Sequence, residues 1–249
     1  MNDDLLHLYH KLRARAATLP TTLVERLGCP FLPFPRDRWH EASHRLLIVG
    51  QEPWEWGFGV ENTNPWPYPP IWSLSNFIDQ NSSVDALTHG YRTHTYEIQS
   101  RYPVGPFGQA SAFFIDSLSR DGIGEVLTTN LVRCTLWDAQ AGDTRVPLPT
   151  ATAQERQPIL DWQRGCLSGE IQVLAPTSVL FLTGPQYDEV LRDEFPLASF
   201  ERVPNQDARQ VARVRHERLP AASFRTYHPG YLRRSGKWLL LKELADLLT

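Results

Sequence analysis

The sequence contains few cysteines, and they are poorly placed for a disulfide framework. Cys29, Cys134 and Cys166 are the only three in 249 residues, and they lie far apart in the chain. No Cys-x-x-Cys pair is present, and the eight histidines show no spacing typical of metal ligands. Small secreted domains depend on dense disulfides, so this pattern favours a reducing compartment. We expect neither a metal nor another cofactor.

Long apolar runs are also missing. No stretch reaches the roughly 18 apolar residues that a transmembrane helix requires. The first residues, "MNDDLLHLYHKLRARAATL", carry acids at positions 3 and 4 and an amphipathic pattern. A signal peptide would instead begin with basic residues followed by an unbroken apolar stretch. We therefore expect an ordinary first helix, no membrane partner and a cytoplasmic location.

Apolar residues make up 41% of the chain, enough for the core of one large domain. Four short apolar runs end at polar or glycine residues and predict strands at 45–51, 125–130, 178–184 and 223–229. Helical spacing between and after them predicts helices within 108–122, 152–176, 185–195 and 235–249. A proline and glycines in the second of these segments are expected to kink or split it. Alternation of this kind predicts an α/β fold, a three-layer αβα sandwich with a central four-stranded mainly parallel sheet.

The segment 55–103 interrupts the alternation with a Trp- and Pro-rich sequence and then polar stretches. We interpret it as an insertion in a single domain spanning 1–249. A loop of this length inside a compact domain is usually functional, or its assignment as a loop is wrong. Its aromatic residues could equally serve only to pack the segment onto the body of the protein.

The end of each predicted strand carries a distinctive polar group. These groups are Glu52, Asn130, the Thr183–Gly184 pair and His228. Ligands of open parallel sheets bind outside the carboxyl ends of the strands, so these groups are expected to share one rim. A Gly-x-Gly-x-x-G motif or a phosphate-loop lysine is missing after the first strand, which disfavours a nucleotide-binding enzyme.

The same strand ends carry a family resemblance. "GQEPW" (50–54) resembles the Gly-Gln-Asp-Pro-Tyr motif of uracil-DNA glycosylases, and "GPFGQASAFF" (105–114) resembles their Pro-Phe segment at a helix start. "TTNLVRC" (128–134), "VLAPTSVLFLTGP" (173–185) and "TYHPGYLRR" (226–234) are similar to later motifs, in the same order. The resemblance covers roughly residues 44–249. One such motif is weak, whereas several in the right order at strand ends are a strong signal.

The resemblance implies a monofunctional DNA glycosylase that flips out a pyrimidine and hydrolyses its N-glycosidic bond. Glu52 would stabilise the cationic sugar and orient water, and His228 would donate to O2 of the departing base. Gln51 would line the base pocket through its backbone, Phe107 would stack on the base, and Asn130 would read its Watson–Crick edge. Trp54 would form the wall that the motif tyrosine forms in relatives.

The loop after His228 would contact DNA, the only partner we expect for a monomeric protein. Tyr231 or Leu232 would fill the emptied base stack, and three cations would hold phosphates: Arg233, Arg234 and Lys237. From residue 201 onward the chain has ten Lys/Arg against five Asp/Glu, although its formal net charge is −3. A basic surface of this kind can hold phosphates, and it can also be an ordinary solvated face.

Departures from the family pattern bear on the substrate. Glu52 replaces Asp and Trp54 replaces Tyr, and Cys29, Cys134 and Cys166 cannot form the four-thiolate cluster of the iron–sulfur branches. The changed motif and the aromatic insertion favour a bulky 5-substituted cytosine in phage DNA, such as glucosylated hydroxymethylcytosine, and a defence role. Uracil excision in repair is the main alternative. An inactive DNA-binding module on the same fold is the second.

Overall fold

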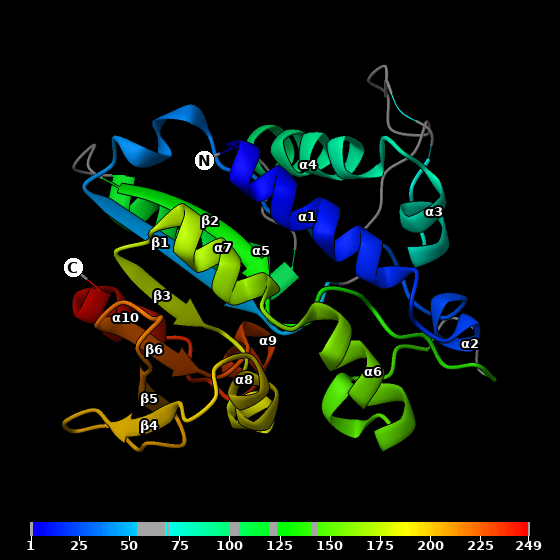
Figure 1. Cartoon of the computed structure of the whole chain (residues 1–249). Coiled ribbons are helices and arrows are strands. Elements are labelled where there is room, and N and C mark those ends of the chain that lie inside the picture. Colours follow the sequence, from blue (N-terminus) through cyan, green and yellow to red (C-terminus); the bar gives the residue numbers. More distant parts are fainter. Residues whose placement is uncertain are drawn as a thin grey trace. The chain divides into compact units, whose positions relative to one another are not determined.

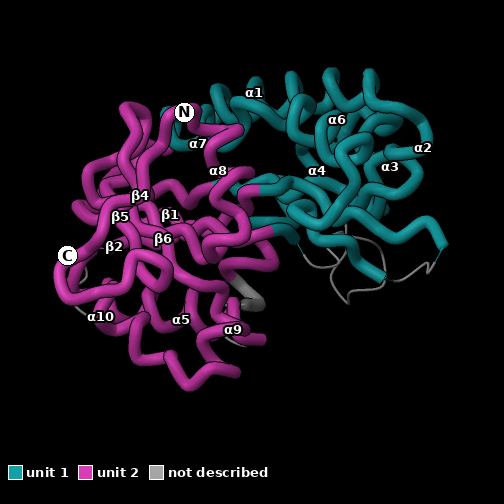
Figure 2. The backbone as a smooth tube through the Cα atoms, turned by 90° about the horizontal axis from the view of Figure 1, so that it is seen from below, with its two compact units in different colours: residues 1–34, 52–92, 132–173 teal, residues 35–51, 93–131, 174–249 magenta. Residues whose placement is uncertain are grey.

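We describe a computed structural model of the chain, which covers residues 2–53, 68, 70–99, 105–119, 124–140 and 144–248. The chain forms two compact units, drawn in different colours in Figure 2. Unit 1 comprises Met1–Phe34, Glu52–Arg92 and Val132–Val173, and unit 2 comprises Pro35–Gln51, Thr93–Leu131 and Leu174–Thr249. The two units interleave along the sequence, so neither is a continuous segment. The single domain expected from sequence stays a prediction.

Unit 2 contains a mixed sheet of six strands in the order β2-β1-β3-β6-β5-β4 (Figure 1). The strands are β1 (His44–Gly50), β2 (Gly124–Asn130), β3 (Ser178–Phe181), β4 (Ser199–Arg202), β5 (Val211–Arg215) and β6 (Ala222–Thr226). β2, β1, β3 and β6 pair in parallel, whereas β5 pairs antiparallel with both β6 and β4. The last five residues of β1 are fully buried, as expected for a parallel strand with neighbours on both sides.

Helices cover both faces of this sheet. The helices of unit 2 are α5 (Gly105–Ser119), α8 (Asp188–Glu194), α9 (Pro229–Arg234) and α10 (Leu240–Leu248), with short helical turns at Asp37–His40, His94–Gln99 and Pro185–Tyr187. Ala110, Phe114 and Leu118 recur every four residues along α5 and pack with strand residues and α10 in one core cluster. On the other face, the ring of Phe181 from β3 meets that of Phe195, which follows α8, with centroids 6.3 Å apart.

The sequence predicts a four-stranded, mainly parallel sheet, and the sheet has six strands and is mixed. All four expected strands are present and mutually parallel. The two additional strands, "SFER" and "VARVR", carry charged residues within short segments, so no apolar run marks them in the sequence. β4 is mostly exposed and owes its position to pairing with β5 rather than to burial.

Unit 1 is largely helical. It holds α1 (Asn2–Ala16), α2 (Thr21–Val24), α3 (Leu74–Asp79), α6 (Ala153–Gln163), the short turn Leu148–Thr150, and all but the last residue of α4 (Ser83–Thr93) and α7 (Cys166–Leu174). The predicted first helix is thus confirmed as α1. The long segment 152–176 is split into α6 and α7 near Gly165, whose φ of +80° suits glycine. The segment 55–103 contains α3 and α4, so part of it is helical.

A buried ion pair holds unit 1 together. Arg133 donates to both carboxylate oxygens of Glu170 at 2.8 Å, and both side chains are almost fully buried. The Tyr9 hydroxyl donates to the same carboxylate at 3.1 Å, which joins α1 to α7. The three cysteines are buried and form no disulfide, and burial raises the pKa of Cys29 and Cys134. Of the described helices, none is long and apolar enough to cross a membrane.

Candidate functional site

The carboxyl ends of the four parallel strands form one rim in unit 2. Gly50, the last residue of β1, pairs directly with Asn130, the last residue of β2. His228 follows β6 by two residues. The chain leaves β1 toward β2 on one side, and it leaves β3 toward the β6 side, so the connections diverge between the neighbouring strands β1 and β3. A point of this kind is where open α/β sheets bind ligands.

Gly50 allows two of the predicted base-binding residues to meet. A Cβ atom at this position would lie 2.5 Å from Oδ1 of Asn130 and 2.9 Å from Cε2 of Phe107. Real Cβ contacts of this length do not occur, so only glycine permits both side chains to approach the strand. Phe107 comes from the first turn of α5, and Asn130 is buried to 7% exposure. The strand end thus combines an aromatic ring with a buried carboxamide.

His228 joins this group on its α5 side. Its ring lies nearly parallel to that of Phe107, with an interplanar angle of 16° and centroids 6.2 Å apart. Its Nδ1 accepts a hydrogen bond from the backbone N–H of Gly230 at 3.1 Å and caps α9. A nitrogen that accepts carries no proton, so the neutral ring has its proton on Nε2. His228 can therefore donate through Nε2.

Gln51 connects two strand ends. Its side-chain Nε2 donates to the backbone oxygen of Thr183 at 2.7 Å, which bridges the ends of β1 and β3. The carboxamide is thus used within the protein. A role in base binding through the backbone of Gln51, as predicted, stays compatible with this contact.

Glu52 follows Gln51 in the chain and belongs to unit 1. There it is 8% exposed, and its Oε1 accepts a hydrogen bond from the backbone N–H of Leu148 at 2.8 Å. The next residue, Pro53, is also held, because its carbonyl accepts from the hydroxyl of Thr135 at 2.5 Å. These two contacts fix the backbone and one carboxylate oxygen at the predicted catalytic position. Leu148 and Thr135 lie 96 and 82 residues away in sequence, so no local pattern could have revealed them.

The segment after His228 separates the two candidate wedge residues. Tyr231 is 41% exposed and its ring lies 4.4 Å from that of Tyr227, measured between centroids. Leu232 is fully buried in the core cluster of unit 2. An inserted side chain must reach out of the protein, so Tyr231 is the member of the pair available for that role.

The predicted phosphate-binding cations surround the same segment. Arg233 and Arg234 are exposed on α9, and Arg233 donates to Oε1 of Gln109 on α5 at 3.1 Å. A Cβ on Gly230 would lie 3.4 Å from Nη1 of Arg234 and 3.2 Å from Nδ1 of His228. The Arg234 guanidinium therefore lies close to the imidazole. Lys237 donates to Oε1 of Gln210 at 3.0 Å.

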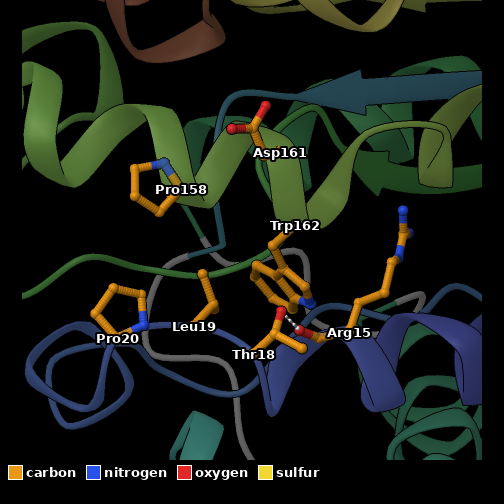
Figure 3. Close-up of a pocket in the computed structure, with 7 residues that line it drawn as sticks. All are labelled: Arg15, Thr18, Leu19, Pro20, Pro158, Asp161 and Trp162. Carbon is orange, nitrogen blue, oxygen red and sulfur yellow. Dashed lines mark hydrogen bonds between the residues drawn. The ribbon is translucent and has the colours of Figure 1, made fainter.

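A separate surface pocket lies within unit 1 (Figure 3). Its volume is about 230 Å³, and it is lined by Arg15, Thr18, Leu19, Pro20, Pro158, Asp161 and Trp162. Oδ1 of Asp161 pairs with Arg164 at 2.9 Å and accepts from Gln157 at 3.0 Å, so one oxygen of its carboxylate is already in contact with two protein groups. None of the residues predicted from sequence lines this pocket.

The structure does not test two of the sequence predictions, the role of Trp54 and the absence of a metal. Trp54, the predicted wall of the base pocket, lies outside the described residues. Within the described residues, no cluster of three or more His, Cys, Asp or Glu side chains could hold a metal ion.

Comparison of the chain with known protein families and with curated proteins found no match.

Proposed function

We propose that this protein is a monofunctional DNA glycosylase with a uracil-DNA glycosylase-like αβα fold. The observation that carries the proposal is the meeting of Phe107 and Asn130 over Gly50, with His228 beside Phe107. An aromatic ring can stack on a flipped base, and a carboxamide can read its edge. In this proposal β2, β1, β3 and β6 are the four-stranded sheet of that fold, and β5 and β4 extend it.

In the proposed reaction the bond between C1′ of the sugar and N1 of the pyrimidine breaks, and its electron pair leaves with the base. Nε2 of His228 donates to O2 of the base, where the negative charge collects. The carboxylate of Glu52 stabilises the cationic sugar and accepts a proton from the water that attacks C1′. The products are a free base and an abasic site.

The remaining predicted residues hold the substrate. Gln51 and Trp54 line the base pocket, Tyr231 fills the gap in the base stack, and Arg233, Arg234 and Lys237 hold phosphates. Support for this division comes from exposure, because the rings or charges of Tyr231, Arg233 and Arg234 reach solvent. DNA is the proposed partner of a monomeric protein in the cytoplasm.

The substrate base follows from the changed motif. Glu52 and Trp54 stand where uracil-specific relatives carry Asp and Tyr, and we propose a bulky 5-substituted cytosine as the target, in a defence role. An amide such as that of Asn130 can donate to O4 of uracil or accept from N4 of cytosine, depending on its orientation. Uracil excision is therefore the competing outcome of the same test.

The test incubates the protein with single- and double-stranded DNA that contains either uracil or glucosylated hydroxymethylcytosine, followed by alkali cleavage of abasic sites. Breaks in the modified-cytosine DNA support the proposal in full, and breaks only in uracil DNA select the competing substrate. Breaks in neither DNA would overturn both substrates.

A charge-neutral variant tests Glu52. Glu52→Gln retains an oxygen that can accept from Leu148 N, so it removes the charge with little change in local structure. We expect the single-turnover rate to fall by about 10²- to 10³-fold, the range seen when one stabilising group is removed. Glu201→Gln, an exposed carboxylate on β4, is the control and retains full activity. An undiminished rate in Glu52→Gln would remove the carboxylate from the mechanism.

A further inference from the structure

A buried arginine holds the loop between β4 and β5. Arg225 lies on β6, three residues before His228, and is 2% exposed. Its Nη1 donates to the carbonyl of Arg209 at 2.8 Å, and its Nη2 donates to the carbonyl of Ala208 at 3.2 Å. Its charge is balanced by Asp188 of α8, with Nε 3.1 Å from Oδ1. Burying a guanidinium is costly, and here its donors are used to fix the backbone of an exposed loop.

The neighbouring residues of the loop are fixed as well. The Thr226 hydroxyl donates to the carbonyl of Gln210 at 2.9 Å, and Lys237 donates to the side chain of the same residue. The carboxylate of Asp207 accepts from the backbone N–H of Arg209 at 2.9 Å. Three successive carbonyls, those of residues 208, 209 and 210, are thus held by β6. The loop is built to present its side chains in one position.

The register of the sheet places this loop at the rim described above. β5 runs antiparallel to β6, and Val211 at its start pairs with Thr226 at the end of β6. The loop that precedes Val211 therefore lies at the same end of the sheet as His228. The turn between β5 and β6, which contains Arg218, lies at the opposite end.

Arg209 is the side chain that this arrangement leaves exposed at the rim. The other arginines of the hairpin contact protein groups: Arg202 donates to Gln206, Arg215 pairs with Glu201, and Arg213 lies over the ring of Phe224. Within the described residues, the Arg209 guanidinium has neither an ion-pair partner nor a hydrogen-bond acceptor. The residue after Arg209 is Gln210, whose side chain accepts the hydrogen bond from Lys237.

We propose that Arg209 is a phosphate-binding residue and that Arg225 is its positioning residue. This inference rests on the proposed glycosylase function and adds the β4–β5 loop to its DNA-binding surface. A guanidinium forms two parallel hydrogen bonds with a phosphate, and a fixed loop loses little entropy on binding. Arg209 and Lys237 then contact the DNA backbone on the β5 side of His228, and Arg233 and Arg234 contact it on the α9 side.

The first experiment measures DNA binding and excision by Arg209→Ala, Arg209→Lys and the control Arg218→Ala over a range of salt concentrations. We expect Arg209→Ala to weaken binding roughly 5- to 10-fold near 0.1 M salt and to reduce the slope of log K against log salt by about one. KM rises while kcat is retained, and Arg209→Lys recovers part of the affinity. Arg218→Ala matches the wild type, because it removes an equal charge from the other end of the sheet.

The outcomes separate the two proposals. A wild type that neither binds nor cleaves DNA overturns the proposed function. A wild type that is active, with Arg209→Ala equal to Arg218→Ala, overturns only the role of Arg209.

A double-mutant cycle tests the positioning role. Arg225→Lys preserves the charge beside Asp188 but cannot reach both loop carbonyls with one ammonium group. We expect it to weaken DNA binding in the wild-type background and to have no further effect in Arg209→Ala, because it acts through that side chain. Additive effects of the two substitutions would show that Arg225 does not act through Arg209. Retention of kcat in the folded Arg225→Lys protein distinguishes positioning from a general loss of structure.

Discussion

The backbone N–H of Gly230 donates to Nδ1 of His228 across 3.1 Å. This contact places a proton on Nε2 of the neutral ring and at the same time caps α9, the helix that carries the exposed cations. Pro229, the first residue of α9, has a φ suited to a helix start and needs no hydrogen-bond acceptor. The same four residues, "HPGY", thus orient the ring of His228 and start the segment that we propose to bind DNA.

Substitution of His228 by alanine tests the donor directly. The Nε2 proton would no longer stabilise the charge on O2 of the base, so we expect the single-turnover excision rate to fall by about 10²- to 10³-fold. The affinity for DNA should fall much less than the rate, because the cations remain and only the cap of α9 is lost. ¹⁵N NMR of the wild type should show the neutral ring with its proton on Nε2.

His216→Ala is a matched control, because Nδ1 of His216 also accepts from a backbone N–H two residues later, that of Arg218 at 3.1 Å. His216 follows β5 at the other end of the sheet, so its loss should leave excision unchanged. Equal rates in His228→Ala and the wild type would remove the proposed donor.

Gly50→Ala tests whether Asn130 and Phe107, the side chains that we propose to bind the base, must lie close together. The added methyl group would overlap Asn130 and Phe107, and one of them has to move. We expect excision to fall by tenfold or more while DNA binding through the phosphates persists, because misplacement of a recognition group by about 1 Å can cost as much as 10²-fold. Gly28→Ala is the control, since its nearest atoms would be 3.7 Å away, an ordinary contact. Full activity in a folded Gly50→Ala protein would contradict the close approach.

The four parallel strands and the polar residues at their ends could be predicted because β1 and β3 contain continuous apolar runs, β2 and β6 contain shorter apolar stretches, and polar residues mark where each strand ends. β4 and β5 could not, since each is a short segment with two charged residues, and only the pairing of β5 with β6 and of β4 with β5 identifies them as strands. The burial and contacts of Arg225 could not be predicted from the sequence either. They depend on Asp188 and Arg209, which lie 37 and 16 residues away in the chain.

The contacts of Glu52 also could not be predicted from the sequence. The sequence marks a carboxylate after a strand, but the hydrogen bond from Leu148 depends on how a distant turn folds. Tyr231 and Leu232 are adjacent and both suit an inserted side chain, and only the packing of α9 buries one and exposes the other.

That difference predicts opposite effects for two neighbouring substitutions. Leu232→Ala should lower the free energy of unfolding by about 2–5 kcal/mol, because it leaves a cavity in the core cluster. Tyr231→Ala should leave stability nearly unchanged but reduce excision from duplex DNA, where the emptied stack must be filled. On single-stranded DNA its rate should approach that of the wild type. Denaturant unfolding and parallel excision assays check both, and a duplex-specific loss in a stable Leu232→Ala protein would reverse the assignment.

The pH dependence of stability tests whether the carboxylate of Glu155 caps the N-terminus of α6. Its carboxylate accepts from the hydroxyl and backbone N–H of Thr152 and from Arg26 at 2.6 Å. These hydrogen bonds, that with the Thr152 hydroxyl first, lower the pKa of Glu155 from its ordinary value of 4.5. A lowered pKa in the folded state means that the ionised carboxylate adds stability above pH 4.5, and this stability is lost as the pH falls through the lowered pKa.

Glu155→Gln should therefore be about 1 kcal/mol less stable than the wild type at pH 7, with the difference shrinking in acid. Urea unfolding at pH 7 and in acid, below the lowered pKa of Glu155, measures this difference in stability. Glu189→Gln is the control, because Glu189 pairs with Arg192 on the same exposed helix face. Its stability should stay within about 0.5 kcal/mol of the wild type. A difference that is independent of pH would show that the ionised carboxylate does not cap the helix.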